Sequence, residues 1–102
     1  MRRAEIFFHN IPAGILEETT KNNFRFTYHI SYSGEPVSLT MPVRNEPYQY
    51  SVFPSFFDGL LPEGLMLEAL LRQLKIDRND SFSQLCAVGK DMVGAVTVRE
   101  LL

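Results

Sequence analysis

The hydrophobic pattern of the first half of the chain has a period of two residues. Between residues 24 and 32 large apolar side chains alternate with polar ones, which predicts a strand with one buried face. Shorter apolar runs at residues 4–8 and 15–20, on either side of the turn-rich residues 9–14, predict a hairpin before it. We expect an antiparallel meander with one solvent-exposed face. Its alternating apolar residues are Phe24, Phe26, Tyr28, Ile30 and Tyr32, followed by Val37, Leu39 and Met41.

The period becomes helical from Pro54 onward. Residues 54–59 predict one short helical turn with Phe56 and Phe57 inside. Pro62 is well placed as the first residue of a helix, because its missing N–H would be unpaired there anyway. The apolar stripe of that helix has a spacing of i, i+3, i+4 and i+7, formed by Leu67, Leu70, Leu71 and Leu74.

A further helix is expected to begin at Asp80 or Ser81 and to end at Gly89, which suits a left-handed cap. Ser81 and Gln84 have the spacing of a capping box. Residues 95–98 predict a last strand that returns to the sheet. The fold class that follows is α+β: a small antiparallel sheet, two to three helices and a short C-terminal strand. The buried positions of the further helix are Phe82, Leu85 and Val88.

Length and charge limit the functional classes. A chain of 102 residues, 45% of them hydrophobic, corresponds to one domain, residues 1–102, with its own core. The ten basic residues are scattered and outnumbered by twelve acidic ones, so binding to nucleic acid by this chain alone is not expected. The single cysteine, Cys86, is typical of a protein of the reducing cytoplasm. No apolar run approaches the length of about 18 residues that a membrane span needs.

Candidate catalytic groups are few, and each has a simpler structural explanation. The pair Gly89-Lys90 lacks the glycine and the hydroxyl residue of a phosphate-binding loop. His9, His29 and Cys86 are too few for a structural zinc site. A nucleophilic pair of Cys86 and His29 remains open, but a thiol within an apolar helix is expected to be buried and inert. We predict a protein without cofactor, metal or enzymatic activity. The carboxylates of Asp58, Glu63 and Asp91 are interpreted as turn and cap residues rather than as an acid–base pair.

One residue of the leucine-rich helix does not fit the buried stripe. At about 100° per residue, Leu65 lies about 160° from Leu67, on a face that should be solvated. Met66 lies at the edge of the stripe. Gly64 costs helix stability and allows another backbone to approach closely. A single exposed leucine is common in proteins without any binding role. Leu65 is therefore a candidate partner contact, with ordinary exposure as the alternative.

Two long segments resemble the N-terminal subdomain of the HipA-family serine/threonine kinases. Residues 24–28 and 39–43 are similar to the strand segments that precede them in that family, and the likeness covers nearly the whole chain in order. None of the family's catalytic or ATP-binding residues has a counterpart here. The segments are Phe56-Phe57-Asp58-Gly59-Leu60-Leu61-Pro62-Glu63-Gly64 and Asp80-Ser81-Phe82-Ser83-Gln84-Leu85-Cys86-Ala87-Val88-Gly89-Lys90-Asp91-Met92-Val93-Gly94-Ala95-Val96.

Because the sequence ends at Leu102, it also resembles the HipS-type subunits of split HipA systems. In such systems the resemblance implies a separate HipT-like serine/threonine kinase and a HipB-like helix-turn-helix repressor. The chain is then expected to bind the kinase in trans and inhibit it, as a cytoplasmic antitoxin. It would join a ternary complex with the repressor and reach DNA only indirectly, without any membrane contact.

The predicted partner surface is the start of the leucine-rich helix. Leu60 and Leu61 have core packing as their alternative role, and so does Met66. Two alternative functions remain open: a subunit that completes or activates the kinase, and an adaptor that links the kinase to the repressor. The predicted partner-binding residues are Leu61, Pro62, Glu63, Gly64, Leu65 and Met66.

Overall fold

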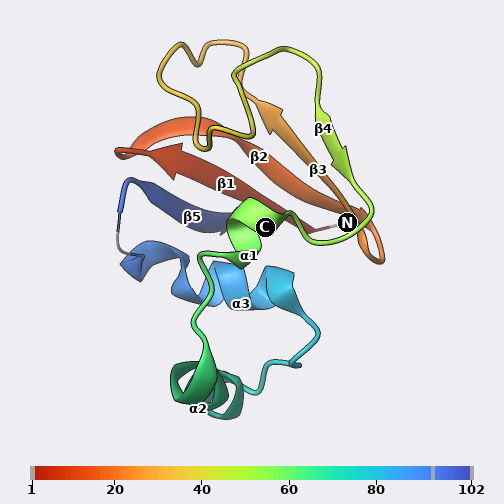
Figure 1. The fold of residues 1–102 in the computed structure, drawn as a ribbon, viewed down its shortest axis with the longest axis vertical. Helices are drawn as coiled ribbons and strands as arrows, with labels where there is room; N and C mark the ends of the chain where they lie inside the picture. Colours follow the sequence, from red (N-terminus) through yellow and green to blue (C-terminus); the bar gives the residue numbers. More distant parts are fainter. Residues whose placement is uncertain (1, 93, 102) are drawn as a thin grey trace.

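Five antiparallel strands form one sheet, and the helices lie on one side of it (Figure 1). The computed structural model describes residues 2–92 and 94–101, with the backbone alone at Asp91. The strand order is β4-β3-β2-β1-β5, so the last strand pairs with the first. The expected α+β class is confirmed. The elements are β1 (Arg2–Phe8), β2 (Ile11–Thr20), β3 (Asn23–Tyr28), β4 (Tyr48–Tyr50), α1 (Ser55–Asp58), α2 (Gly64–Leu74), α3 (Ser81–Val88), a 3-10 turn η1 (Gly89–Asp91) and β5 (Val96–Leu101).

The hairpin of β1 and β2 is tighter than the sequence predicts. Only His9 and Asn10 form its turn, with φ of 50° and 66°, the left-handed geometry that two-residue hairpin turns need. Pro12 and Gly14, expected in the turn, lie within β2. At Gly14 a side chain would meet the carbonyl oxygen of Thr27 at 2.5 Å, so this glycine allows close approach of β3 and is not a turn residue.

The predicted strand over residues 24–32 is wrong in its second half. β3 ends at Tyr28, and Ile30 is 94% exposed instead of facing the core. The alternation at residues 37–41 belongs to an irregular connection, in which Leu39 is also 94% exposed. On the side away from β2, the strand that pairs with β3 is β4, so residues 37–41 are not its partner.

A buried tyrosine holds this long connection in place. The Val37 N–H donates to the Tyr28 hydroxyl at 3.0 Å, and that hydroxyl donates to the carbonyl of Met41. Val37 and Met41 are both buried, so the backbone is fixed on either side of the exposed Leu39. The alternating pattern at residues 37–41 therefore identifies the buried Val37 and Met41 correctly, but this segment is not a strand and Leu39 is not buried.

Helix α3 confirms the expected segment and its bounds, but the capping at both ends differs from the prediction. Asp80 is the N-cap and accepts from the Ser83 N–H, whereas the Gln84 amide donates to the carbonyls of Asp77 and Arg78 and forms no capping box. Gly89 has a right-handed φ of −58° and leads into η1, so the expected left-handed cap is wrong. Glycine is required at position 89 for a steric reason, because a Cβ there would lie 2.4 Å from the Val98 carbonyl oxygen.

The core lies between the sheet and helices α1 and α3. Its buried side chains come from the inward positions of four strands, two helices and the β3–β4 connection. Within the described part of the chain, no helix is long and apolar enough to cross a membrane. The largest fully buried side chains are Phe26, Phe57, Phe82, Ile6, Leu16, Met41, Leu85 and Val98, together with Pro54.

Candidate partner-docking site

Helix α2 lies apart from the sheet, below α3 in the view of Figure 1. Pro62, expected as its first residue, precedes the helix; Glu63 is the N-cap and Gly64 begins the helix. Of the predicted apolar stripe only Leu71 is buried, while Leu74 is 50% exposed. The domain therefore covers only part of the apolar surface that this helix carries.

The predicted partner-binding residues divide into a half-buried group and an exposed group. Leu61 and Pro62 are half-buried, and Leu61 packs against the core, as its alternative role required. Leu65 and Met66 are 87% and 75% exposed. Core packing of Met66 is therefore wrong, and the solvated position expected for Leu65 is confirmed. The exposed members of the segment are Glu63, Gly64, Leu65 and Met66.

The start of α2 is formed by residues that are poor at starting a helix. The Glu63 side chain makes no capping hydrogen bond, and the first backbone bond, from Leu67 N–H to the Glu63 carbonyl, is long at 3.5 Å. Gly64 has φ of +60°, a conformation that other L residues rarely adopt, and a Cβ there would meet nothing within 4 Å. Glycine is needed here for the backbone angle, and the space beside it is open to a partner.

The exposed apolar residues form one outward face. On a helix of about 3.6 residues per turn, Ala69 follows Leu65 by four positions and Met66 by three, so the three side chains are neighbours. Ala69 is exposed as well. Because alanine is small, it leaves the two larger side chains standing above the helix surface. This geometry suits insertion of Leu65 and Met66 into a hollow of another protein.

The exposed charges at the start of α2 and on the segment that leads into it are acidic. Asp58 and Glu63 are exposed, and among the described residues neither side chain has a hydrogen-bond or ion-pair partner. Glu68, one turn into α2, is paired with Arg78. The basic residues Arg72 and Lys75 lie at the opposite end of the helix.

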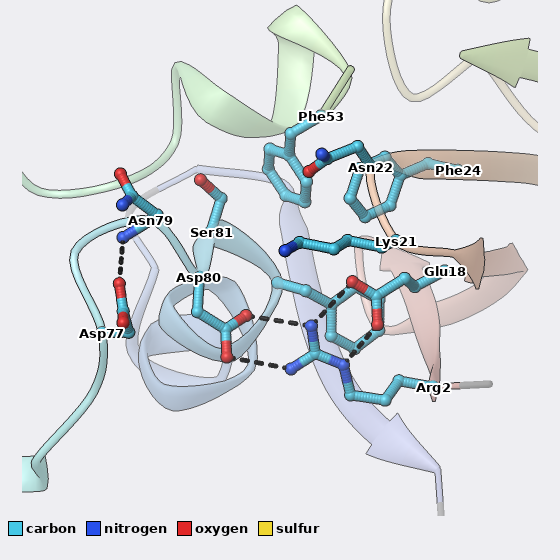
Figure 2. Close-up of a pocket in the computed structure, with 11 residues that line it drawn as sticks. Arg2, Glu18, Lys21, Asn22, Phe24, Phe53, Asp77, Asn79, Asp80 and Ser81 are labelled. Carbon is cyan, nitrogen blue, oxygen red and sulfur yellow. Dashed lines mark hydrogen bonds and ion pairs between the residues drawn. The ribbon is translucent and has the colours of Figure 1, made fainter. Parts of the chain in front are cut away.

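A polar hollow of about 370 Å³ beside α3 is occupied by groups that already pair with one another (Figure 2). The Arg2 guanidinium lies between two carboxylates, at 2.7 and 2.8 Å from Glu18 and at 3.0 and 3.1 Å from Asp80. These hydrogen bonds raise the pKa of Arg2. Burial by itself would raise the pKa of Asp80, but the bonds from Arg2 and Ser83 outweigh it and lower that pKa. The network joins β1, β2 and α3 and is structural.

The other candidate groups do not assemble into a reactive centre. Cys86 is half-buried, and burial, followed by the nearby Glu100, raises the pKa of its thiol to about 12. His29 Nε2 lies 2.9 Å from Glu5 Oε2, so its contact is with a carboxylate of β1. No group of three or more His, Cys, Asp or Glu side chains with metal-binding geometry occurs among the residues that the structure describes. The side chain of Asp91, the third proposed turn carboxylate, lies outside them.

The sequence did not indicate two features of the surface. The Arg2–Asp80 pair joins residues 78 positions apart, and no local signal could have linked them. Ile30 and Leu39, the most exposed large apolar residues, were assigned to a buried strand face. The turn residues between them, at positions 33–36, were the available signal for an irregular segment.

The fold and the exposed helix define a small α+β domain whose clearest candidate site is a surface for another macromolecule. The HipA N-terminal domain family matches residues 4–99, and the chain belongs to this family. The match concerns the N-terminal domain of HipA and not its catalytic portion, and it supports a component of HipA-type toxin–antitoxin systems.

Two relatives agree with this assignment. An uncharacterized protein of Haemophilus influenzae strain Rd is 31% identical over 98% of this chain and 93% of its own length. A solved structure described as the N-terminal domain of HipA toxin superimposes with a TM-score of 0.78 at 26% identity. The superposition covers 100% of this chain and 94% of that one.

Proposed function

We propose that this domain is the non-catalytic antitoxin subunit of a split HipA-type system. It binds a HipT-like serine/threonine kinase in trans and inhibits it. Leu65 is the anchor and fills an apolar pocket near the nucleotide cleft of the kinase, with Met66 beside it. The complex forms in the cytoplasm, and DNA is reached only through a HipB-like repressor.

The exposure of Leu65 carries the proposal. A leucine that is 87% exposed on an ordered helix has nearly its whole side chain to bury on binding. Full burial is worth about 1.5–3 kcal/mol, or roughly a ten- to hundredfold gain in affinity. The family assignment supports the kind of partner, because the chain belongs to the N-terminal domain family of HipA, and under the proposal this domain meets the kinase core as a second molecule. Such an association depends on concentration and can be regulated.

The test is a phosphorylation assay of a HipT-like kinase in the presence of increasing amounts of this domain. Leu65→Glu places a charge in the apolar pocket and should raise the concentration for half-inhibition at least about tenfold. The control is Val52→Glu, at an exposed apolar residue between β4 and α1 that belongs to neither proposed surface. Both variants should keep the thermal midpoint of the wild type. Equal inhibition by Leu65→Glu and wild type would refute Leu65 as the anchor.

A second candidate function is supported by the far end of the molecule. Ile30 and Leu39 are each 94% exposed on the connection that the Tyr28 hydroxyl fixes, well away from α2. A second apolar surface is what an adaptor between the kinase and the repressor would need. It would serve equally a subunit that completes the kinase and activates it. The sign of the effect in the phosphorylation assay separates inhibition from activation. An operator gel shift with the three proteins added singly and together tests the bridging role.

A further inference from the structure

The start of α2 combines exposed apolar side chains with carboxylates that the domain itself does not use. Glu63 directly precedes Gly64, Leu65 and Met66, and it is exposed, without a capping bond or an ion pair among the described residues. Asp58, at the end of α1, is also exposed and forms no side-chain hydrogen bond or ion pair with the described residues. The nearest other carboxylate along α2, Glu68, is already paired with Arg78. Glu63 therefore leaves a free negative charge directly beside the apolar face, and Asp58 adds a second one on the segment that leads into α2.

The local structure gives little reason for a glutamate at this position. An N-cap residue works by a short side chain that accepts a hydrogen bond from the helix, and serine, threonine, aspartate and asparagine do this best. Glu63 holds the N-cap position without making that bond. Its remaining local effect is a favourable interaction with the positive end of the helix, which any acidic residue of the first turn could supply.

From these charges we infer that the kinase surface that receives Leu65 has a cationic rim, and that Glu63 makes the charged contact beside the apolar anchor. This inference rests on the proposed function and names the chemistry of the partner surface: an apolar pocket whose mouth is lined by lysine or arginine. Groups of that charge surround phosphate-binding sites in kinases. The contact is a rim interaction, which increases the association rate and the selectivity more than the final affinity.

The same charges argue against the other possible occupants of this face. A second copy of the chain that buries Leu65 against its own equivalent, about a two-fold axis beside that residue, would also bring Glu63 toward its own equivalent. The chain carries a net charge of −2, so long-range forces between copies are repulsive as well. An anionic lipid surface or a nucleic acid would be repelled by Glu63 and Asp58 for the same reason.

The test compares variants that separate charge from helix stability. Glu63→Ser removes the charge and introduces a better N-cap, so a purely structural role predicts equal or greater stability and unchanged binding. A charged contact predicts binding to the HipT-like kinase about two- to fivefold weaker, the range of an exposed ion pair. Glu63→Arg should weaken it further. The control is Glu46→Ser, at an exposed glutamate in the β3–β4 connection, which should bind as the wild type does.

Salt provides the second measurement. Raising the ionic strength from about 0.1 M to about 1 M shortens the Debye length from about 10 to about 3 Å, so the wild type and Glu63→Ser should converge in affinity. If Glu63→Ser and Glu63→Arg both bind like the wild type at the lower salt, the cationic rim is refuted while the proposed function stands. If the wild type does not bind the kinase at all, both fail. A dimer of the isolated chain that Leu65→Glu dissociates would make a second copy the occupant and overturn the inference.

Discussion

Replacing Asp80 with asparagine measures what the charge network contributes to the fold. The asparagine keeps an oxygen that can accept from the Ser83 N–H, so the helix cap is preserved, but the charged contacts with Arg2 at 3.0 and 3.1 Å are lost. The Arg2 and Asp80 side chains are 35% and 31% exposed, so solvent screens their attraction. We therefore expect a loss of about 0.5–1 kcal/mol at neutral pH, as for a surface pair. In a domain of this size that corresponds to a thermal midpoint lower by about 2–8 °C.

The lowered pKa of Asp80 determines how the stability contributed by this pair changes with pH. Because the pKa of Asp80 is lower in the folded protein, the unfolded chain binds a proton first as the pH falls. The stabilisation is complete above the unfolded pKa of about 4 and disappears as the pH falls through the lower folded pKa. Urea unfolding of wild type and Asp80→Asn should differ at pH 7 and converge progressively below about pH 4. Asp58→Asn, at an exposed carboxylate that pairs with none of the described residues, is the control. Equal stability at pH 7, or a difference that persists in acid, would refute the role assigned to the network.

Two further experiments, one substitution with its control and one labelling reaction, test the packing of α3. Gly89→Ala should destabilise the domain by about 1–3 kcal/mol, because its Cβ would lie 2.4 Å from the Val98 carbonyl oxygen. Gly59→Ala, where the nearest atoms are 3.5 Å away, should be tolerated, and urea unfolding of the two variants that gave equal midpoints would contradict this reason. The Cys86 thiol, whose pKa is about 12 against an ordinary 9.0, should carry roughly a thousandfold less thiolate than a free thiol at pH 8. Labelling by a disulfide reagent should then be slow in the native protein and fast in urea, and fast native labelling would show that the thiol is not protected.

Local pattern was sufficient for the elements whose hydrophobic face is also their buried face. The strands on either side of the first hairpin, the short helix around Phe57 and the helix over Phe82 and Leu85 all lie close to where periodicity placed them. The local hydrophobic pattern gave a wrong prediction where the conformation of a segment depends on a hydrogen bond to a residue distant in the sequence. The connection after β3 is fixed by the hydroxyl of Tyr28, and an alternating pattern does not distinguish such a connection from a strand.

The candidate site was predicted by the same kind of reasoning, and for that reason only in part. Helical spacing placed Leu65 away from the leucine stripe, and its exposure of 87% confirms this. The spacing could not show that the stripe itself would be incompletely covered, because burial depends on which neighbours the tertiary fold supplies. Likewise, the proline signal placed the helix start two residues early, because Gly64, with its left-handed φ, begins the helix and Pro62 does not.

The incomplete burial of α2 is the physical reason for proposing that this helix is the docking element. An isolated helix of 11 residues is marginal in water, and most helices are stabilised by packing one apolar face on their own domain. Here Leu71 packs inward, while Leu65 and Met66 point to the other side and Leu74 is half-exposed. Exposed apolar side chains on a second side of a helix are typical of a surface that another molecule covers. Under the proposed function, the kinase supplies that surface, and its binding should protect the backbone amides of α2 from hydrogen exchange more than those of α3, which the core already covers.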